Sequence, residues 1–368
     1  MASTVDTLEC DVLIIGGGIA GLSLASELAP ETPVVLLEAE PTLAFHTSGR
    51  SAQQLIPSYG PPAVRALTRR TLAALAALPS VGRPLVWPSR FLLVGTAGDV
   101  RAHRSDTMRE VGHAEALALA PALLPESFEA AGLDETSVRT DADALIEHHR
   151  ALAADSGARI LTGRRVAAAE RHDGGWLVSA AGVAVRARRV VNAAGAWADQ
   201  VAGLFGARPL SLVPLRRTAA YVRVERPPDP ATPMVGSADH TWYFRPHGDK
   251  VLVSPSEAVP ARPGDARPVA ADVDALVRRL NSITTLGITG VERAWTGLRT
   301  EAADGNPVLG FDPEVGDFLW LAGQGGYGFQ TSSGMAELAA ARLLGGPSPF
   351  PDAVASALAP ERLAVFDR

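Results

Sequence analysis

The chain has 368 residues, of which 47% are hydrophobic and 20% are charged, and its formal net charge is −6. This is the composition of a folded globular protein, and the length favours two domains, or one domain with a large insertion, over a single core. The small acidic charge and the lack of a basic run argue against nucleic acid or an anionic membrane as a partner.

The N-terminal region and the cysteine content bear on the compartment. Cys10 is the single cysteine, which excludes an internal disulfide framework and agrees with a reducing environment. The apolar stretch at residues 12–28 follows Glu9 and Asp11, where a signal peptide would carry positive charge, and it is too broken by glycine for a membrane span. We therefore expect a soluble, cytoplasmic protein that is complete from its first residue.

The first elements in chain order form a βαβ unit. Residues 11–15 are a continuous apolar run, as in a buried parallel strand, and residues 16–21 form a glycine-rich turn. Helical spacing follows over residues 19–28, and residues 33–38 form a second apolar strand that ends in an acid.

The turn of this unit has a dinucleotide-binding pattern. Gly16, Gly18 and Gly21 make G-x-G-x-x-G between strand and helix, a pattern that lets backbone amides approach a pyrophosphate at a helix N-terminus. Glu38 closes the next strand, where a carboxylate accepts hydrogen bonds from the adenosine ribose. The unit alone leaves NAD and FAD open. The segment "FHTSGRSA" soon after Glu38, in place of further alternating strands and helices, favours a flavoprotein.

The rest of the chain alternates between helical and extended patterns, with proline and glycine between them. The pattern predicts helices at residues 61–78, 141–154, 271–286 and, as the last, 332–344. It predicts strands or β-rich segments at residues 83–94, 159–161, 174–195, 215–225, 241–246, 250–254 and 318–322.

A second glycine cluster, "GQGGYGFQTSSG", follows the predicted strand at residues 318–322. Such dense glycine marks a sharp turn or a close approach of the backbone to a ligand. A strand-to-helix turn that needs glycine only for packing is the alternative.

Six segments together resemble the D-amino acid oxidase superfamily of FAD enzymes: "DVLIIGGGIAGLSLASELA", "VLLEAE", "HTSGRSA", "VVNAAGAWAD", "WTGLR" and "GQGGYGFQTS". Within the superfamily they are most similar to bacterial D-arginine dehydrogenases. The resemblance implies an α/β fold with a Rossmann-like FAD-binding domain of the glutathione-reductase type, formed by residues 1–82, 141–207 and 301–368. An α+β substrate domain on an antiparallel sheet, formed by residues 83–140 and 208–300, is inserted into it.

The resemblance also implies the cofactor contacts. The loop at residues 323–328 would run along the flavin ring, with the following helix N-terminus favouring negative charge on the reduced ring. We expect non-covalent FAD, although His46 lies at the position of the histidine to which dimethylglycine dehydrogenases bind FAD covalently. The predicted FAD-binding residues are Gly16, Gly18, Ile19, Ala20, Gly21, Glu38, Ala39, His46, Thr47, Ser48, Gly49, Arg50, Ser51, Ala52, Val166, Ala193, Ala194, Gly195, Trp197, Gly325, Gly326, Tyr327, Gly328, Phe329, Gln330 and Thr331.

The substrate site is predicted from the same resemblance. Arg299 and Tyr243 would hold the substrate carboxylate, because an arginine fork makes two parallel hydrogen bonds to it. Arg216 would assist, with Arg217 as the alternative inward residue. The alternatives are a surface or domain-interface position for Arg299 and a cross-strand packing role for Tyr243. The resemblance places Tyr59 over the pocket, the Gly326 carbonyl at the substrate amine, and Gln330 at the ring or substrate.

Two departures from D-arginine dehydrogenases bear on specificity. Phe91 lies where those enzymes have the glutamate that binds the substrate guanidinium, and Gln54 replaces a histidine. The basic side chain of a bound D-arginine would therefore be buried without a counter-charge, which is costly. We therefore predict FAD-dependent oxidative deamination of neutral or apolar D-amino acids in preference to D-arginine.

Several alternatives stay open at this point. The donor could instead be a secondary amine, such as sarcosine or a cyclic imino acid, or a 2-hydroxy acid, and a flavin-binding redox sensor is the non-enzymatic alternative. The electron acceptor, whether oxygen, a quinone or a protein, is undetermined. We predict no metal site, because His148 and His149 fit the solvated face of a helix better than a ligand pair.

Overall fold

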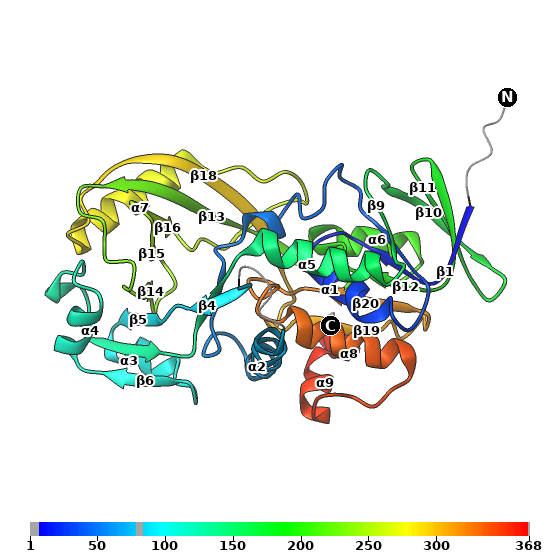
Figure 1. The fold of residues 1–368 in the computed structure, drawn as a ribbon, viewed down its shortest axis with the longest axis horizontal. Helices are drawn as coiled ribbons and strands as arrows, with labels where there is room; N and C mark the ends of the chain where they lie inside the picture. Colours follow the sequence, from blue (N-terminus) through cyan, green and yellow to red (C-terminus); the bar gives the residue numbers. More distant parts are fainter. Residues whose placement is uncertain (1–6, 79–83, 367–368) are drawn as a thin grey trace.

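The computed structural model describes residues 7–78 and 84–366 of the chain. Two large β-sheets lie toward opposite ends of the long axis, as Figure 1 shows. One has eight strands and the other nine, and a three-stranded sheet joins segments that all lie within residues 54–140. The predicted mixed α/β architecture is confirmed. Among the described residues, no helix is long and apolar enough to span a membrane.

The eight-stranded sheet is built on the predicted βαβ unit. Strand β1 (Thr7–Ile15) pairs in parallel with β2 (Val34–Leu37) and β12 (Val183–Asn192), β2 pairs in parallel with β9 (Arg159–Leu161), and β20 (Phe318–Ala322) continues the sheet from β12. The main path runs β10 (Val166–His172), β11 (Gly175–Ala180), β12, β1, β2, β9, and β19 (Val308–Phe311) pairs with β20 on the side away from β12.

Both faces of this sheet are buried, which explains the continuous apolar runs of its strands. Val12 and Ile14 pack in a core with helices α1 (Ile19–Leu28), α5 (Ala142–Asp155) and α8 (Ser332–Leu344). Leu13 and Ile15 alternate to the other face and pack in a second core, which includes residues of helix α6 (Ala198–Leu204).

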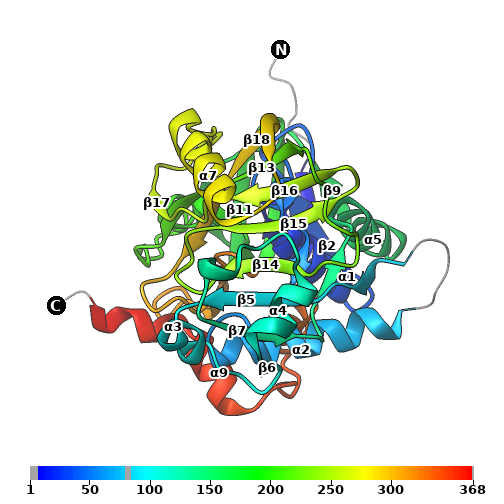
Figure 2. The same ribbon diagram turned by 90° about the vertical axis from the view of Figure 1, so that its left-hand side faces the viewer.

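The nine-stranded sheet is mostly antiparallel and faces the viewer in Figure 2. Its order is β17 (Val259–Pro260), β13 (Val213–Val224), β16 (Lys250–Ser254), β15 (Tyr243–His247), β14 (Met234–Ser237), β5 (Phe91–Gly95), β7 (Ala130–Asp134), β6 (Met108–Val111), with β18 (Ile288–Glu301) on β13. Phe244 packs on one face, in a core with Leu276 and Leu280 of helix α7 (Ala270–Ile283). Tyr243 and Arg245 alternate to the opposite face, which looks toward the first sheet.

The three-stranded sheet, β3 (Gln54–Leu55), β8 (Val138–Thr140) and β4 (Val86–Pro88), corrects one prediction. A single strand was predicted over residues 83–94, and residue 83 lies outside the described residues. The structure has two strands, β4 and β5, in different sheets. Pro88 lacks the N–H that a ladder needs, and Ser89 N bonds to Ser137 O where the chain leaves β4.

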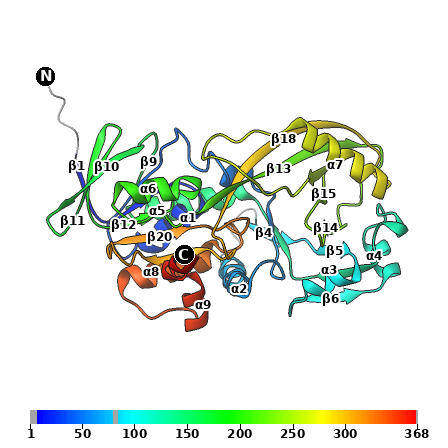
Figure 3. The ribbon, with the colours of Figure 1, turned by 180° about the vertical axis from the view of Figure 1, so that it is seen from behind.

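The C-terminal region corrects a second prediction, because α8 is not the last helix. Gly345 ends α8 in the left-handed conformation (φ 71°), and Pro351 precedes helix α9 (Asp352–Leu358), which Figure 3 shows below α8. Helices α3 (Ala97–Ala102) and α4 (His113–Leu119) have no clear sequence signal. Helix α2 (Pro62–Ala77) corresponds to the helix predicted at residues 61–78. Short 3₁₀ helices are Ser48–Arg50, Pro125–Ser127, Gly195–Trp197 and Pro360–Phe366.

The domain boundaries stay a prediction, which the membership of the sheets supports. Strands of the eight-stranded sheet fall within residues 1–82, 141–207 and 301–368. Strands of the nine-stranded sheet fall within residues 83–140 and 208–300, apart from the last residue of β18.

Candidate functional site

A cavity of about 490 Å³ lies where the ends of β1, β2 and β12 meet the segment after β2, strand β18 and the loop before α8. The carboxyl ends of parallel strands are where α/β sheets place ligand sites. Most of the predicted FAD-binding residues line the cavity: Gly16, Gly18, Ile19, Ala20, Glu38, Ala39, His46, Thr47, Ser48, Arg50, Ser51, Ala52, Val166, Ala193, Ala194, Gly195, Trp197, Gly325, Gly326, Gly328, Phe329 and Gln330.

The first glycine turn is shaped by close backbone contacts. Gly16 has φ +115°, and a Cβ at that position would lie 2.4 Å from the Ala193 carbonyl oxygen. A Cβ at Gly21 would lie 2.0 Å from the carbonyl oxygen of Gly16, so helix α1 starts tightly against the turn. These contacts leave the N-terminus of α1, with Gly18 as its N-cap, on the cavity wall.

The carboxylate of Glu38 holds this turn against the end of β2. Its Oε2 accepts a hydrogen bond from the Gly17 amide at 2.6 Å, and its Oε1 accepts one from the Glu40 amide at 2.8 Å. Glu38 therefore orders the rim of the cavity and also lines it.

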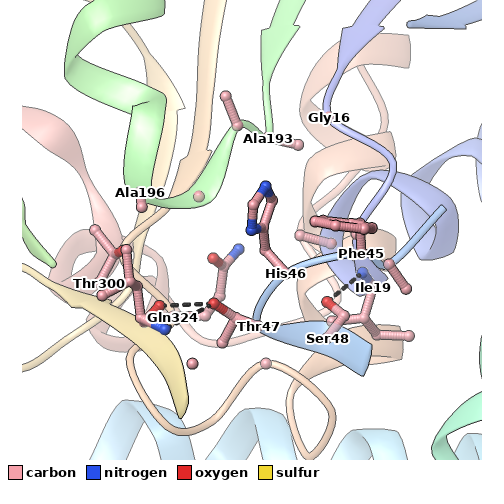
Figure 4. A pocket seen from close by; sticks show the side chains of 18 of the residues that line it. Gly16, Ile19, Phe45, His46, Thr47, Ser48, Ala193, Ala196, Thr300 and Gln324 are labelled. Atoms are coloured by element: carbon pink, nitrogen blue, oxygen red, sulfur yellow. Dashed lines mark hydrogen bonds between the residues drawn. The ribbon is translucent and has the colours of Figure 1, made fainter. Parts of the chain in front are cut away.

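The segment after β2 is hydrogen-bonded to helix α1 and to strand β18, and Figure 4 shows its residues His46, Thr47 and Ser48. The Ser48 hydroxyl accepts a hydrogen bond from the Ile19 amide at 3.0 Å, and the Thr47 hydroxyl donates one to the Leu298 carbonyl at 2.8 Å. His46 lies 3.1 Å from Glu40 Oε1 through its Nε2. Its Nδ1 is buried and has no hydrogen-bond partner among the described residues.

The second glycine cluster lies beside the first. A Cβ at Gly328 would lie 3.3 Å from Cγ2 of Ile19, which is the first residue of α1. Next to it, a Cβ at Gly326 would lie 2.5 Å from Nη1 of Arg299, so the loop backbone rests against this guanidinium. The two clusters are remote in sequence and line one cavity.

A smaller cavity of about 90 Å³ adjoins the first. Seven residues line both cavities: Ala52, Gln54, Arg217, Tyr243, Arg299, Gly326 and Gln330. The smaller one has apolar lining from Ile56, Phe91, Leu93, Met108, Met234 and Trp242, and polar lining from residues that include His103 and His240. No aspartate or glutamate lines it in the described part of the chain.

The two arginines at the junction project from neighbouring strands. Arg217 of β13 pairs with Gly297 of β18, and Leu215 pairs with Arg299, so both arginines lie on the same face of the sheet. Burial, and next the charge of Arg299, lowers the pKa of Arg217 below its usual value. Arg217 Nε is buried without a hydrogen-bond partner among the described residues. This arrangement favours an anion between the two guanidinium groups.

Arg216 corrects a prediction, because it lines neither cavity. Successive strand residues point to opposite faces, so Arg216 points away from Arg217 and forms an ion pair with Asp272 of α7 at 3.2 Å. The alternative residue, Arg217, takes the inward position. The signal was present in the alternation along β13, but the sequence did not show which of its faces is inward.

Gln330 and Tyr59 differ in part from expectation. The Gln330 side chain is 3% exposed and already hydrogen-bonded: its Nε2 donates to Thr68 Oγ1 at 3.0 Å, and its Oε1 accepts from the Ile56 amide at 3.3 Å. Gln330 therefore braces the cavity wall. Tyr59 lines only the smaller cavity, with its ring 5.3 Å from that of Tyr327.

Four predicted FAD-binding residues do not line the larger cavity. Gly21 packs inside α1, and a Cβ at Gly49 would lie 2.5 Å from the Ala44 carbonyl oxygen. Thr331 is fully buried and its hydroxyl donates to the Tyr327 carbonyl at 2.8 Å. Tyr327 lies against Tyr59.

The histidines of α5 correct another expectation. His149 is buried, not solvated, because its face of α5 packs on α1, where Ser26 Oγ lies 2.9 Å from its Nδ1. Burial, with a smaller effect of His148, lowers the pKa of His149 to about 4. Within residues 7–78 and 84–366, no group of three or more His, Cys, Asp or Glu side chains could hold a metal ion.

Comparison with known proteins assigns the class. Residues 11–342 match the sequence model of the family described as "DAO: FAD dependent oxidoreductase". The chain therefore belongs to this family and is an FAD-dependent oxidoreductase. Its resemblance to D-arginine dehydrogenases in particular stays a prediction.

Curated relatives of the chain differ in their substrates. The chain is 26% identical over 307 residues to D-erythritol 1-phosphate dehydrogenase of Brucella abortus (strain 2308), covering 74% of this chain and 59% of that protein. It is 25% identical over 344 residues to glycine oxidase of Geobacillus kaustophilus (strain HTA426), covering 86% of this chain and 88% of the oxidase.

Solved structures share the fold across almost the whole chain. Glycine oxidase from Geobacillus kaustophilus superposes with a TM-score of 0.82 at 23% identity, covering 94% of this chain and 97% of that one. L-proline dehydrogenase from P. horikoshii superposes with a TM-score of 0.85 at 19% identity, covering 98% of this chain and 99% of that one. At these identities the likeness extends to the fold alone.

Proposed function

We propose that the protein oxidises neutral or apolar D-amino acids, with FAD as hydride acceptor, to imino acids that hydrolyse to 2-oxo acids and ammonia. The observation that carries this proposal is a small apolar cavity joined to the large one at two adjacent arginines, Arg217 and Arg299.

FAD would occupy the large cavity. Its pyrophosphate would lie at the N-terminus of α1, where Gly16 and Gly18 keep the backbone open, and its ring would lie near Gly326. We expect the binding to be non-covalent. Two facts support this: His46 Nε2 is engaged with Glu40, and Cys10 is buried in β1 with its pKa raised to about 12, mainly by burial.

The substrate carboxylate would lie between Arg217 and Arg299, with Tyr243 beside it, because two guanidinium groups can each donate charge-assisted hydrogen bonds. The substrate amine would donate to the Gly326 carbonyl. The same positive charges favour the neutral amine over the ammonium, and a neutral amine is what hydride loss from the α-carbon requires. Fixing these groups orients the α-hydrogen toward the acceptor.

The side chain of the substrate would enter the smaller cavity. Phe91 lines it where D-arginine dehydrogenases have a glutamate, and no carboxylate among the described residues lines it. A guanidinium there would be desolvated without a counter-charge, which is costly. The D configuration rests on the motif resemblance.

The test is anaerobic mixing of the FAD-loaded protein with a panel of D- and L-amino acids while the flavin absorbance is followed. Fast bleaching by D-leucine or D-phenylalanine and slow bleaching by D-arginine is the expected result. A clear lead for L-amino acids or for D-arginine would refute the proposal.

A secondary amine, such as sarcosine or a cyclic imino acid, is the second candidate donor. It is favoured by the small size of the side-chain cavity. Sarcosine, L-proline and 2-hydroxy acids therefore belong in the same panel. If no compound in the panel bleaches the flavin, a redox sensor is favoured. Mixing the reduced protein with oxygen, a quinone or an electron-transfer protein then identifies the electron acceptor.

A further inference from the structure

Arg245 is a buried cation that the proposed reaction leaves without a role. It lies in the middle of β15 and is 2% exposed. Its Nη2 donates a hydrogen bond to the Ala52 carbonyl at 3.1 Å. Its Nε and Nη1 are buried without a hydrogen-bond partner among the described residues. Leaving N–H donors of a charged group unpaired in the interior is costly unless the charge serves another purpose.

The surroundings of Arg245 increase this cost. Burial, and next the neighbouring charge of Arg139, lowers the pKa of Arg245 to about 10, while Tyr221 and Tyr243 oppose the shift. The Arg139 guanidinium lies 5.3 Å from the Trp87 ring, and its Nε is also buried without a partner in the described chain. Two cations therefore lie close together with no ion pair to either of them within the described residues.

The hydrogen bond to Ala52 places this charge directly behind the wall between the two cavities, because Ala52 lines both of them. The wall has an unusual backbone, since Gln53 is left-handed with φ 62°. Its amide donates to Ser51 Oγ at 3.0 Å, and its carbonyl accepts from the Thr140 amide at 3.1 Å. Arg245 thus also anchors a strained turn, a feature that occurs often at functional sites.

We propose that Arg245 is a fixed positive charge that stabilises the negative charge of the reduced flavin and so raises its reduction potential. When the C–H bond of the donor breaks, its hydrogen leaves with both electrons as hydride and bonds to N5. With FAD bound, this transfer would leave negative charge on the flavin ring; an amine donor would become an iminium ion that loses its proton to water, and a hydroxyl donor would lose its proton to water and become a carbonyl. A preorganised cation in a low-dielectric interior stabilises such a charge more than water would. The inference depends on FAD and not on the identity of the donor.

The test compares FAD-loaded variants by their affinity for sulfite, which adds to N5 and leaves an anionic flavin. Arg245→Met removes the charge and Arg245→Lys keeps it. Arg342→Met is the matched control, since Arg342 is half-buried on α8 and donates to the Leu309 carbonyl at 3.0 Å, outside both cavity linings.

We expect Arg245→Met to bind sulfite about tenfold more weakly, which corresponds to a potential about 30 mV lower for a two-electron couple. Arg245→Lys should retain most of the wild-type affinity, and Arg342→Met all of it. A dye-equilibration measurement of the midpoint potential should show the same order. Wild-type affinity in an FAD-saturated Arg245→Met protein would refute the proposal, as would an equal loss in Arg342→Met.

If Arg245→Met does not fold, Arg245→Gln keeps a hydrogen-bond donor for the Ala52 carbonyl without the charge and should show the same loss of sulfite affinity. A measurement on the wild type offers a second way to refute the proposal. The proposal requires N1 of the bound, reduced flavin to lose its proton at a lower pH than N1 of free reduced FAD. Spectra of the dithionite-reduced protein over a pH series give this value. Titration at the same pH as free reduced FAD, or at a higher one, would overturn the proposal. Failure of every donor in the substrate panel would leave it intact, so the two proposals fail separately.

Discussion

The neighbours Arg216 and Arg217 allow a matched test of the carboxylate site, because they differ only in the face of β13 from which they project. Arg217→Met removes an inward guanidinium that lines both cavities. Arg216→Met removes an outward guanidinium that pairs with Asp272 at 3.2 Å. Methionine keeps much of the side-chain volume in both variants, so the main change is the charge and its hydrogen bonds.

The magnitude follows from the two environments. A hydrogen bond to a charged group contributes about 1.5–3 kcal/mol, and loss of Arg217 also relieves its repulsion with Arg299, which offsets part of that. We therefore expect a net loss of about 2 kcal/mol, or about 30-fold in kcat/KM. The Arg216–Asp272 pair is partly exposed, and such pairs contribute about 0–1 kcal/mol to stability, so kcat/KM should hardly change in Arg216→Met.

The assay is anaerobic flavin reduction at several concentrations of the best D-amino acid, which separates the Kd from the limiting rate. Arg217→Met should change the Kd more than the limiting rate of flavin reduction, because the carboxylate contact is present before hydride transfer as well as during it. Equal kinetics in the two variants, or a larger effect of Arg216→Met, would refute the inward assignment of Arg217.

Three further predictions concern specificity, cofactor binding and pH. Phe91→Glu should shift the ratio of kcat/KM for D-arginine over D-leucine upward by about tenfold or more, since it supplies a buried counter-charge; an unchanged ratio contradicts the assigned cavity. Gly16→Ala should lower FAD content and Tm, whereas Gly203→Ala in α6, where a Cβ meets nothing within 4 Å, should keep both; equal effects contradict the close approach at Gly16. The pKa of His149 near 4 means that the folded state excludes a proton that the unfolded chain binds below the ordinary histidine pKa of 6.5. The free energy of unfolding should therefore fall by about 2 kcal/mol from pH 7 to 5, as urea titrations measure, and a His149→Gln variant with the same fall would contradict this.

Local patterns in the sequence were sufficient where neighbouring residues decide the structure. The helices at Ile19–Leu28 and Ser332–Leu344 and the strands at Arg159–Leu161 and Phe318–Ala322 have the predicted bounds. Each is followed within two residues by a glycine or a proline, which marks where it ends. The region around residues 97–134 was poorly predicted because its helices and strands are short and their apolar residues follow no long period.

The sequence by itself determined the family, its cofactor and the two glycine segments that line the large cavity, because these depend on residue types at short, fixed spacing. Only the tertiary structure decided that Arg217 and not Arg216 faces the cavity, that His149 is buried, and that Arg245 lies behind Ala52. Each of these depends on which face of a strand or helix packs inward, and that is set by pairing and packing between segments far apart in the chain.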